Sequence, residues 1–163
     1  MSDSGRVGIG FDAHPFVAGR VLRLGGIEVP HPVGLKGHSD GDALLHAIAD
    51  AILGAAGLAS IGEFFPDTDS SLEGADSGEL LARVRDVARR SGFTIGNVDA
   101  VVIAEAPKIA PQREAMRLRI AELLEVPADR VNVRGTSSNG LGFPGRGEGI
   151  AATAVVLLVP AGS

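Results

Sequence analysis

The sequence contains no cysteine, no tryptophan and no tyrosine among its 163 residues. The lack of cysteine excludes disulfides, thiolate metal sites and a cysteine nucleophile. The sequence also lacks a basic cluster, because 20 Asp and Glu outnumber 15 Lys and Arg and give a formal net charge of −5. A nucleic-acid-binding protein needs a basic face, so we expect no nucleic-acid partner.

Long hydrophobic runs are missing as well. The first residues, Met1–Gly5, have neither the basic start nor the apolar core of a signal peptide. The longest apolar stretch, Ile150–Pro160, is too short to span a bilayer. We therefore expect no membrane association and a cytoplasmic location.

The hydrophobic spacing predicts one α+β domain (an α/β sandwich), in which a mainly four-stranded sheet is covered by three helices. This single catalytic domain would span residues 1–163, with an ordered core of about 6–159. The expected strands are Arg6–Ala13, one or two strands within Arg20–Val29 broken at Gly25–Gly26, Val98–Glu105, Val131–Arg134 and Ile150–Val159. The expected helices begin at Ser39 or Asp40, at Asp76–Ser77 and at Pro111, and Ala59–Ala75 is expected to be a loop.

Two potential metal ligands lie at the end of the first expected strand. Asp12 and His14 are two residues apart, so their side chains leave the same face of the strand, while Phe11 and Ala13 point to the other face. Pro15 follows at once, and we expect strand pairing to stop there.

The first helix supplies a third ligand. Asp42, His46 and Asp50 follow one another at four-residue spacing, which forms one polar stripe on an otherwise aliphatic helix. Such groups are costly to bury unless they are paired or bound to metal. We predict a zinc site of Asp12, His14 and His46 with an open fourth position, although Mn²⁺ or Fe²⁺ suits the same ligands. Asp50, or Asp42 from the other side, would orient the imidazole.

The entrance of the same helix is a candidate phosphate site. His38 and Ser39 precede it, and free backbone N–H groups at a helix N-terminus attract anions. Ser39 is equally well explained as an ordinary N-cap, and the two roles are compatible. A different phosphate-binding pattern, Gly8-x-Gly10-x-x-Ala13, matches a dinucleotide fingerprint only in its letters, because Pro15 stands where that motif needs a helix.

Taken together, several segments resemble one family, the 2-C-methyl-D-erythritol 2,4-cyclodiphosphate synthases of the non-mevalonate isoprenoid pathway. The resemblance extends from about Arg6 to Val159. The segments that carry it are Gly10–His14, His38–Asp42, His46, Phe65–Asp69, Ala106–Lys108 and Gly145–Gly149.

The resemblance implies a homotrimer with active sites between subunits. It implies conversion of 4-diphosphocytidyl-2-C-methyl-D-erythritol 2-phosphate to the 2,4-cyclodiphosphate with release of CMP, by metal-assisted intramolecular phosphoryl transfer. Zinc would sit on Asp12, His14 and His46, and a second cation, Mg²⁺ or Mn²⁺, would assist. His38 and Ser137 would donate to the developing charge, as the catalytic residues.

The resemblance also implies the substrate-binding residues. The metal ligands Asp12 and His14 belong to this set, as do His38 and Ser39 beside the phosphate. The methylerythritol side and the ribose would contact Ser60, Gly62, Phe65, Asp67 and Asp69. The cytosine side would be lined by Ala104, Pro107, Lys108, Ile109, Ala110, Thr136 and Ser137, with Ser138, Asn139, Phe143 and Arg146 nearby.

Two positions depart from the family pattern. Asn139 stands where the family usually has an acidic ligand for the second cation, so we expect weaker binding of that ion. Ser60 stands where an Asp usually meets the ribose hydroxyls, which loses a charge-assisted hydrogen bond.

Three readings therefore remain open. Besides the synthase, the chain could be a metal-dependent phosphohydrolase of nucleotide diphosphates. It could also be a trimeric metal- and nucleotide-binding homologue with weak or no turnover.

The resemblance also places three residues near the trimer axis. These are Arg146, Glu148 and Phe11, which would either surround an isoprenoid diphosphate or only form intersubunit salt bridges.

Overall fold

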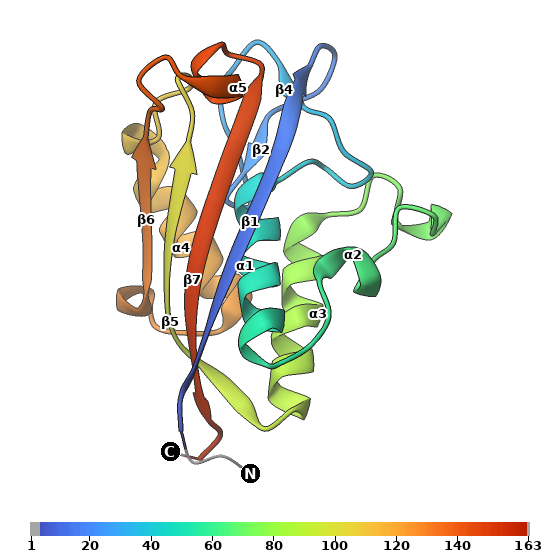
Figure 1. Cartoon of the computed structure of the whole chain (residues 1–163), viewed down its shortest axis with the longest axis vertical. Helices are drawn as coiled ribbons and strands as arrows, with labels where there is room; N and C mark the ends of the chain where they lie inside the picture. The colour runs from blue at the N-terminus through green and yellow to red at the C-terminus, as the bar shows by residue number, and fades with distance from the viewer. Residues whose placement is uncertain (1–3, 163) are drawn as a thin grey trace.

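The computed structural model describes residues 4–162, and its centre is a mixed sheet with the strand order β4-β1-β7-β5-β6 (Figure 1). Strand β7 pairs antiparallel with β1 and β5, and β5 pairs parallel with β6. The strands are β1 (Arg6–Val17), β4 (Gly34–Leu35), β5 (Phe93–Ile103), β6 (Val131–Thr136) and β7 (Gly149–Pro160). The four longer strands agree with the prediction, and β4 adds a short fifth. Residues 1–3 and 163 of the predicted domain lie outside the described residues.

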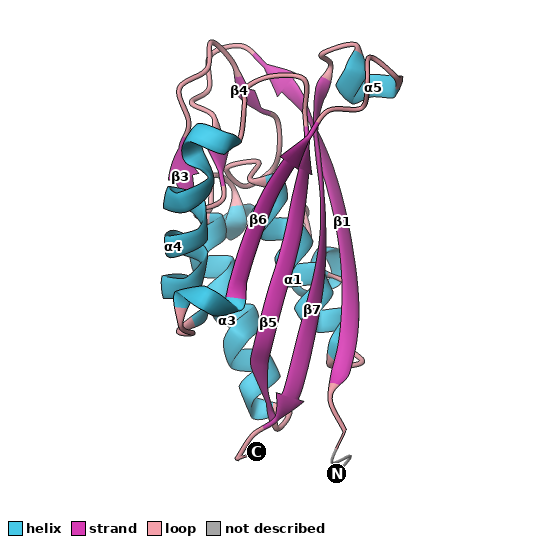
Figure 2. Ribbon diagram, turned by 90° about the vertical axis from the view of Figure 1, so that its left-hand side faces the viewer, coloured by secondary structure: helices cyan, strands magenta, loops and turns pink. Residues whose placement is uncertain are grey.

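Three long helices cover one face of this sheet (Figure 2): α1 (Ala43–Ala55), α3 (Ser77–Arg90) and α4 (Arg113–Leu124). The shorter elements are the ribbon of β2 (Arg23–Leu24) and β3 (Ile27–Glu28), the helices α2 (Ile61–Phe64) and α5 (Gly142–Gly145), and 3-10 turns at Ser70–Leu72, Ala110–Gln112 and Ala128–Arg130. Within residues 4–162, no helix combines the length and the apolar character needed to cross a membrane.

Several predicted boundaries are wrong. Strand β5 begins at Phe93 rather than Val98, and the expected loop Ala59–Ala75 contains helix α2 and a 3-10 turn. Helix α1 begins at Ala43 rather than near Ser39, because the side chain of Asp42 accepts the Leu45 N–H and caps it. Helix α4 begins at Arg113, after a 3-10 turn that contains Pro111. Strand β1 continues to Val17 rather than stopping at Pro15. Pro15 has no N–H to donate, but its carbonyl oxygen accepts the N–H of Lys36, and the N–H of the next residue, Phe16, donates to the carbonyl oxygen of Glu148.

Two glycines bring β1 directly against α1. A Cβ on Gly8 would lie 1.9 Å from the carbonyl oxygen of Ala51, and a Cβ on Gly10 would lie 1.9 Å from that of Ala47. Any side chain at these positions would force the helix away from the strand. The glycines thus serve helix–strand packing, and this close approach positions His46 of α1 beside the ligands of β1.

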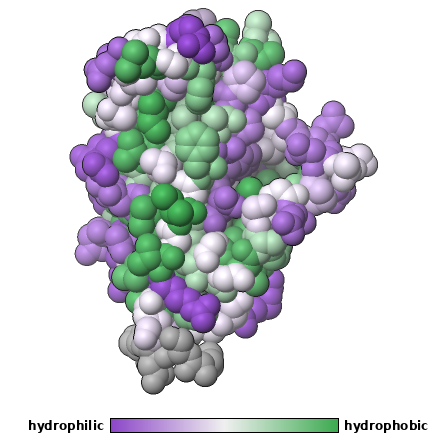
Figure 3. Space-filling view, in the orientation of Figure 1, coloured by the Kyte–Doolittle hydropathy of each residue, from purple (hydrophilic) through white to green (hydrophobic). Residues whose placement is uncertain are grey.

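The opposite face of the sheet is left open by the helices, and it is hydrophobic. On β1 the alternation that buries Gly8 and Gly10 leaves Val7, Ile9 and Phe11 70%, 73% and 61% exposed. Val155 of β7 is also exposed. Hydrophobic side chains gather over these strands in the space-filling view (Figure 3). As predicted, Phe11 points away from Asp12 and His14.

Candidate metal centre

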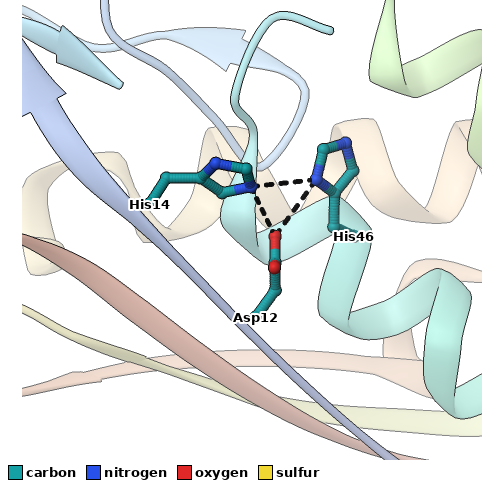
Figure 4. Close-up of side chains that lie close together, drawn as sticks. All are labelled: Asp12, His14 and His46. Atoms are coloured by element: carbon teal, nitrogen blue, oxygen red, sulfur yellow. Dashed lines mark hydrogen bonds and ion pairs between the residues drawn. The ribbon is translucent and has the colours of Figure 1, made fainter. Parts of the chain in front are cut away.

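Asp12, His14 and His46 come together as the sequence predicts (Figure 4). Asp12 Oδ2 lies 2.7 Å from His14 Nε2 and 3.1 Å from His46 Nδ1, and the two nitrogens are 3.3 Å apart. Tetrahedral zinc with bonds of about 2.0–2.1 Å to nitrogen and oxygen sets its ligand atoms roughly 3.3 Å apart. The three groups therefore fit one small cation.

The backbone fixes which nitrogen of His14 faces Asp12. His14 Nδ1 lies 2.7 Å from the carbonyl oxygen of Lys36, which can only accept a hydrogen bond. Nδ1 must therefore carry a proton, and in neutral His14 the lone pair of Nε2 points at the Asp12 carboxylate. Two acceptors at 2.7 Å require a positive charge between them, either a proton or a metal ion.

Electrostatics show the same need for a cation. Burial alone would raise the pKa of Asp12, but hydrogen bonds and opposite charge from His14 and His46 lower this pKa to about 2. Burial would lower the pKa of His14, yet the hydrogen bond and the charge of Asp12 raise it above its usual value. A bound metal would replace the proton held between the two groups.

The predicted supports of His46 are wrong. Asp50 Oδ1 accepts the N–H of Ile61 at 2.9 Å and thus holds the start of α2. Asp42 is fully buried and accepts the N–H groups of Gly25 at 3.0 Å and Gly26 at 2.8 Å. The four-residue spacing correctly put these side chains on one stripe, but each has a backbone partner.

The second nitrogen of His46 instead meets two serines. Nε2 lies 2.8 Å from Ser77 Oγ and 3.1 Å from Ser39 Oγ. Both serines are almost fully buried. Ser39 is therefore not the N-cap of α1, and the entrance of that helix is filled by the carboxylate of Asp42 rather than open to a phosphate.

A cavity of about 330 Å³, which we call the triad cavity, opens on the three ligands. Besides the triad it is lined by Gly37, His38, Ser39, Ile61, Gly62, Phe65, Asp67, Leu72 and Leu80. His38 Nε2 lies 2.9 Å from the carbonyl oxygen of Asp69, so this nitrogen donates to the backbone. Neutral His38 then offers only an acceptor, and donating to a phosphate from Nδ1 requires its imidazolium form.

A second cavity of about 630 Å³, the edge cavity, lies beside the ends of β5 and β6. It is lined by Ala104, Pro107, Lys108, Ile109, Ala110, Arg113, Arg134, Gly135, Thr136 and Ser137. Every residue predicted for the cytosine side from Ala104 to Ser137 is among them. In the sheet β5 lies two strand spacings and β6 three from β1, so about 10 to 14 Å separates β1 from the strands beside the edge cavity, at about 4.8 Å per spacing.

Six predicted residues line neither cavity: Ser60, Asp69, Ser138, Asn139, Phe143 and Arg146. Ser60 is the N-cap residue of α2, without a side-chain capping bond. Arg146 pairs with Glu148 of the same chain at 2.6 Å. An isoprenoid diphosphate near Arg146 and the exposed Phe11 stays a prediction.

The loop after β6 is held by Glu105, a role that the sequence did not predict. Glu105 Oε1 accepts the backbone N–H groups of Ser138 and Gly140, at 3.3 and 3.2 Å. Asn139, between them, adopts a left-handed backbone with φ of 56°, which asparagine tolerates well. The sequence also did not single out Ser77, which contacts His46, or Arg113 and Arg134, which line the edge cavity. Of these residues, only Glu105 could have been suspected from the sequence, because it directly precedes the segment Ala106–Lys108.

Comparisons with known proteins agree with this geometry. The sequence matches the family described as the YgbB family over residues 5–159. The chain belongs to the YgbB family. A protein of Halalkalibacterium halodurans named 2-C-methyl-D-erythritol 2,4-cyclodiphosphate synthase is 56% identical over 154 residues, which cover 94% of this chain and 98% of the relative. A protein of the same name from Pseudomonas putida (strain W619) is 54% identical over 156 residues, covering 96% and 99%.

Solved structures of similar proteins have the same fold. The bifunctional IspDF of Campylobacter jejuni superposes with a TM-score of 0.94 at 45% identity, covering 98% of this chain and 43% of that chain. The CDP complex of Plasmodium falciparum IspF gives a TM-score of 0.85 at 33% identity, covering 98% and 99%. The resemblance stated from the sequence is thereby confirmed.

Proposed function

We propose that this chain is an enzyme that converts 4-diphosphocytidyl-2-C-methyl-D-erythritol 2-phosphate to 2-C-methyl-D-erythritol 2,4-cyclodiphosphate and CMP. The observation that carries the proposal is the Asp12–His14–His46 cluster, whose three ligand atoms face a common point in the wall of the triad cavity. The shared name of the relatives supplies the reaction, and the CDP bound by a related protein supports a cytidine nucleotide in the edge cavity.

Zinc is the proposed ion at the triad, since two imidazoles and one carboxylate suit it and leave a coordination position free. When bound, it would act as a Lewis acid toward a phosphate oxygen. A second divalent cation, Mg²⁺ or Mn²⁺, would neutralise the remaining charge of the diphosphate. Asn139 offers this ion a neutral oxygen at most, so the substrate phosphates and water would supply most of its ligands.

The chain's own residues would act mainly by positioning. In the proposed reaction an oxygen of the substrate's 2-phosphate attacks the β-phosphorus, and the bond from that phosphorus to the bridging oxygen of CMP breaks. Nucleophile and leaving group belong to one molecule, so the protein must fold the substrate into an in-line geometry. Asp67 and Phe65 would hold the methylerythritol end, and His38, as imidazolium, and Ser137 would donate to the phosphates.

Two observations support the proposed homotrimer with shared sites. The triad cavity and the edge cavity of one chain lie at different strands of the sheet, which suits a substrate whose phosphates bind at the triad of one chain and whose cytosine lies in the edge cavity of a neighbouring chain. The open sheet face presents Val7, Ile9 and Phe11, which a monomer would leave exposed to water.

The proposal is tested by incubating the purified protein with the cytidine diphosphate substrate, Zn²⁺ and Mg²⁺, and measuring CMP and the cyclic product together. We expect both in equal amounts. Inorganic phosphate or an open-chain bisphosphate would instead indicate a phosphohydrolase. Bound zinc and nucleotide without CMP release would indicate the binding homologue, for which the changes at Asn139 and Ser60 are the candidate causes.

A matched pair of variants ties the activity to the triad. Asp12→Asn removes the charge that lies between the two imidazoles and should abolish both zinc binding and CMP release. Asp86→Asn makes the same chemical change on the exposed side of α3 and should leave both unchanged. Equal activity in the two variants would contradict the proposed role of the cluster.

A further inference from the structure

The beginning of α3 contacts the metal cluster from behind. Ser77, the first residue of that helix, is 1% exposed, and its Oγ lies 2.8 Å from His46 Nε2. The same Oγ lies 2.5 Å from Asp40 Oδ1, and the Ser77 N–H donates to Asp40 Oδ2 at 3.0 Å. Asp40, Ser77 and His46 thus form a continuous hydrogen-bonded chain that ends at a metal ligand.

Asp40, at the end of the hydrogen-bonded series away from the metal ligand, determines which group donates in each of these hydrogen bonds. Both oxygens of Asp40 already accept backbone N–H groups, Oδ2 from Ser77 and Oδ1 from Asp42 at 3.0 Å, as expected for an ionised carboxylate. The single hydroxyl proton of Ser77 must therefore point at Asp40, at a distance typical of O–H···O⁻ bonds. Ser77 Oγ is then left as an acceptor toward His46, and its distance of 2.8 Å from Nε2 requires the proton on that nitrogen. Ser39 Oγ, 3.1 Å from Nε2, can share this proton as a second acceptor.

We propose that Asp40 and Ser77 are positioning residues that keep His46 in its Nε2–H tautomer, with the Nδ1 lone pair directed at the metal point between Asp12 and His14. His46 then matches His14, whose Nδ1 is bonded to the Lys36 carbonyl and whose Nε2 faces the same point. In each imidazole a protein acceptor holds one N–H, and the other nitrogen is free to bind. The inference rests on the proposed metal site.

The same pair joins two segments that are distant in the sequence. The backbone around Asp40 bonds to the loop before α3 through Gly74 N–H to the His38 carbonyl at 2.7 Å and Asp40 N–H to the Ala75 carbonyl at 3.2 Å. Ser77 is therefore held in place by backbone bonds as well as by its own side chain. The geometry does not depend on an adjustable surface contact.

The experiment measures zinc affinity by chelator competition and the tautomer of His46 by long-range nitrogen–proton NMR of the zinc-loaded protein. Ser77→Ala should weaken zinc binding about 10- to 100-fold, the usual effect of losing a residue that orients a metal ligand. The Nε2–H signal of His46 should lose its hydrogen-bonded shift, and Ser77→Thr, which keeps the hydroxyl, should restore both.

A control variant separates positioning from helix stability. Asp76→Ala removes the side chain that caps the same helix at the Gly78 N–H, at 2.7 Å, without contacting His46. It should lower the melting temperature while leaving zinc affinity unchanged. If Asp76→Ala weakens zinc binding as much as Ser77→Ala does, the role of Ser77 is merely structural and the inference is overturned.

Zinc affinity and the His46 tautomer of the wild-type protein distinguish a failure of this inference from a failure of the proposed function. A wild-type protein that binds no zinc overturns both. A wild-type protein that binds zinc with the proton of His46 on Nδ1, or a Ser77→Ala variant with unchanged zinc affinity and His46 signal, overturns the positioning role alone.

Discussion

Gly10 of β1 lies against the carbonyl oxygen of Ala47 in α1 so closely that a Cβ would be 1.9 Å from that oxygen. Gly10→Ala must therefore push the strand and the helix apart, at a cost of about 1–3 kcal/mol in the free energy of unfolding. Because His46 lies on the same helix and Asp12 on the same strand, zinc affinity should fall as well. Urea denaturation and chelator competition measure the two effects.

Gly54→Ala provides the control for this substitution on the same helix. Its Cβ would have 3.8 Å to the nearest neighbour, the carbonyl oxygen of Ile9. We expect an unchanged zinc affinity and a gain of about 0.5–1 kcal/mol, as for a helical glycine replaced by alanine. A Gly10→Ala variant as stable as the wild type would contradict the close packing described for β1.

Asp42 should be important for stability rather than for metal binding. Its fully buried carboxylate accepts three backbone N–H groups, those of Gly25, Gly26 and Leu45. Burial raises its pKa, and the N–H groups of Gly26 and Leu45 oppose that shift. Asp42→Ala should lower the free energy of unfolding by about 3 kcal/mol, because buried donors lose their partner. Asp42→Asn keeps one acceptor oxygen and should lose less; equal losses in a urea titration would argue against this account.

The metal-free chain should show a pH-dependent stability that zinc removes. The lowered pKa of Asp12 contributes stability above its ordinary value of 3.8 that is lost as the pH falls toward about 2. The raised pKa of His14 contributes stability that is complete below 6.5 and is lost as the pH rises through the raised value. With EDTA, the free energy of unfolding should therefore decline from pH 6 to pH 9.

Zinc at the same ligands replaces the proton, so the zinc-loaded protein should not share this decline. Asp12→Asn should flatten the profile of the metal-free protein, because His14 then has no charged partner. A metal-free wild type whose stability is constant across this range would rule out the proposed coupling between Asp12 and His14.

Residue 139 should set the requirement for the second cation. Asn139→Asp adds a negative charge, and aspartate tolerates the left-handed backbone with φ of 56°. The Mg²⁺ concentration for half-maximal CMP release should fall about tenfold, because a charged oxygen binds this hard cation more tightly than an amide. Steady-state rates over a Mg²⁺ series measure the change; an unaltered requirement would place the second ion away from residue 139.

Glu105 should matter for catalysis without affecting zinc. Its carboxylate holds the loop that carries Ser137 and Asn139 through the N–H groups of Ser138 and Gly140. Glu105→Ala should lower the rate of CMP release about 10- to 100-fold by displacing these groups. Zinc affinity should be unchanged, since the loop lies by the edge cavity; a parallel loss of zinc would contradict this separation.

The parts of the site that were predictable from the sequence are those set by local geometry. Strand alternation places Asp12 and His14 on one face, and the glycines at 8 and 10 share that face, so the strand can meet a helix there. The expectation that His46 joins them depended on its place in a polar stripe of an otherwise aliphatic helix, where an unpaired ionisable group is costly to bury. This local reasoning also gave the three long helices and the four long strands.

The errors have a common physical origin. Spacing put Asp42, His46 and Asp50 on one stripe of α1 but could not tell which neighbour each would meet. In the structure Asp42 accepts a hydrogen bond from the turn at Gly25, and Asp50 accepts one from the start of α2. The partner of His46, Ser77, is 31 residues further along the chain. Such a contact arises only from the packing of α3 beside α1, and no local pattern encodes it.

The two faces of strand β1 have different roles. Its even-numbered positions from Gly8 to His14 face α1 and hold the metal ligands, and the odd-numbered ones from Val7 to Phe11 form the open hydrophobic face. Inserting or deleting one residue early in the strand would exchange the two sets along its length. Phe11 would then point into α1 and Asp12 would point outward. A change of one residue would therefore remove both the metal site and the hydrophobic face.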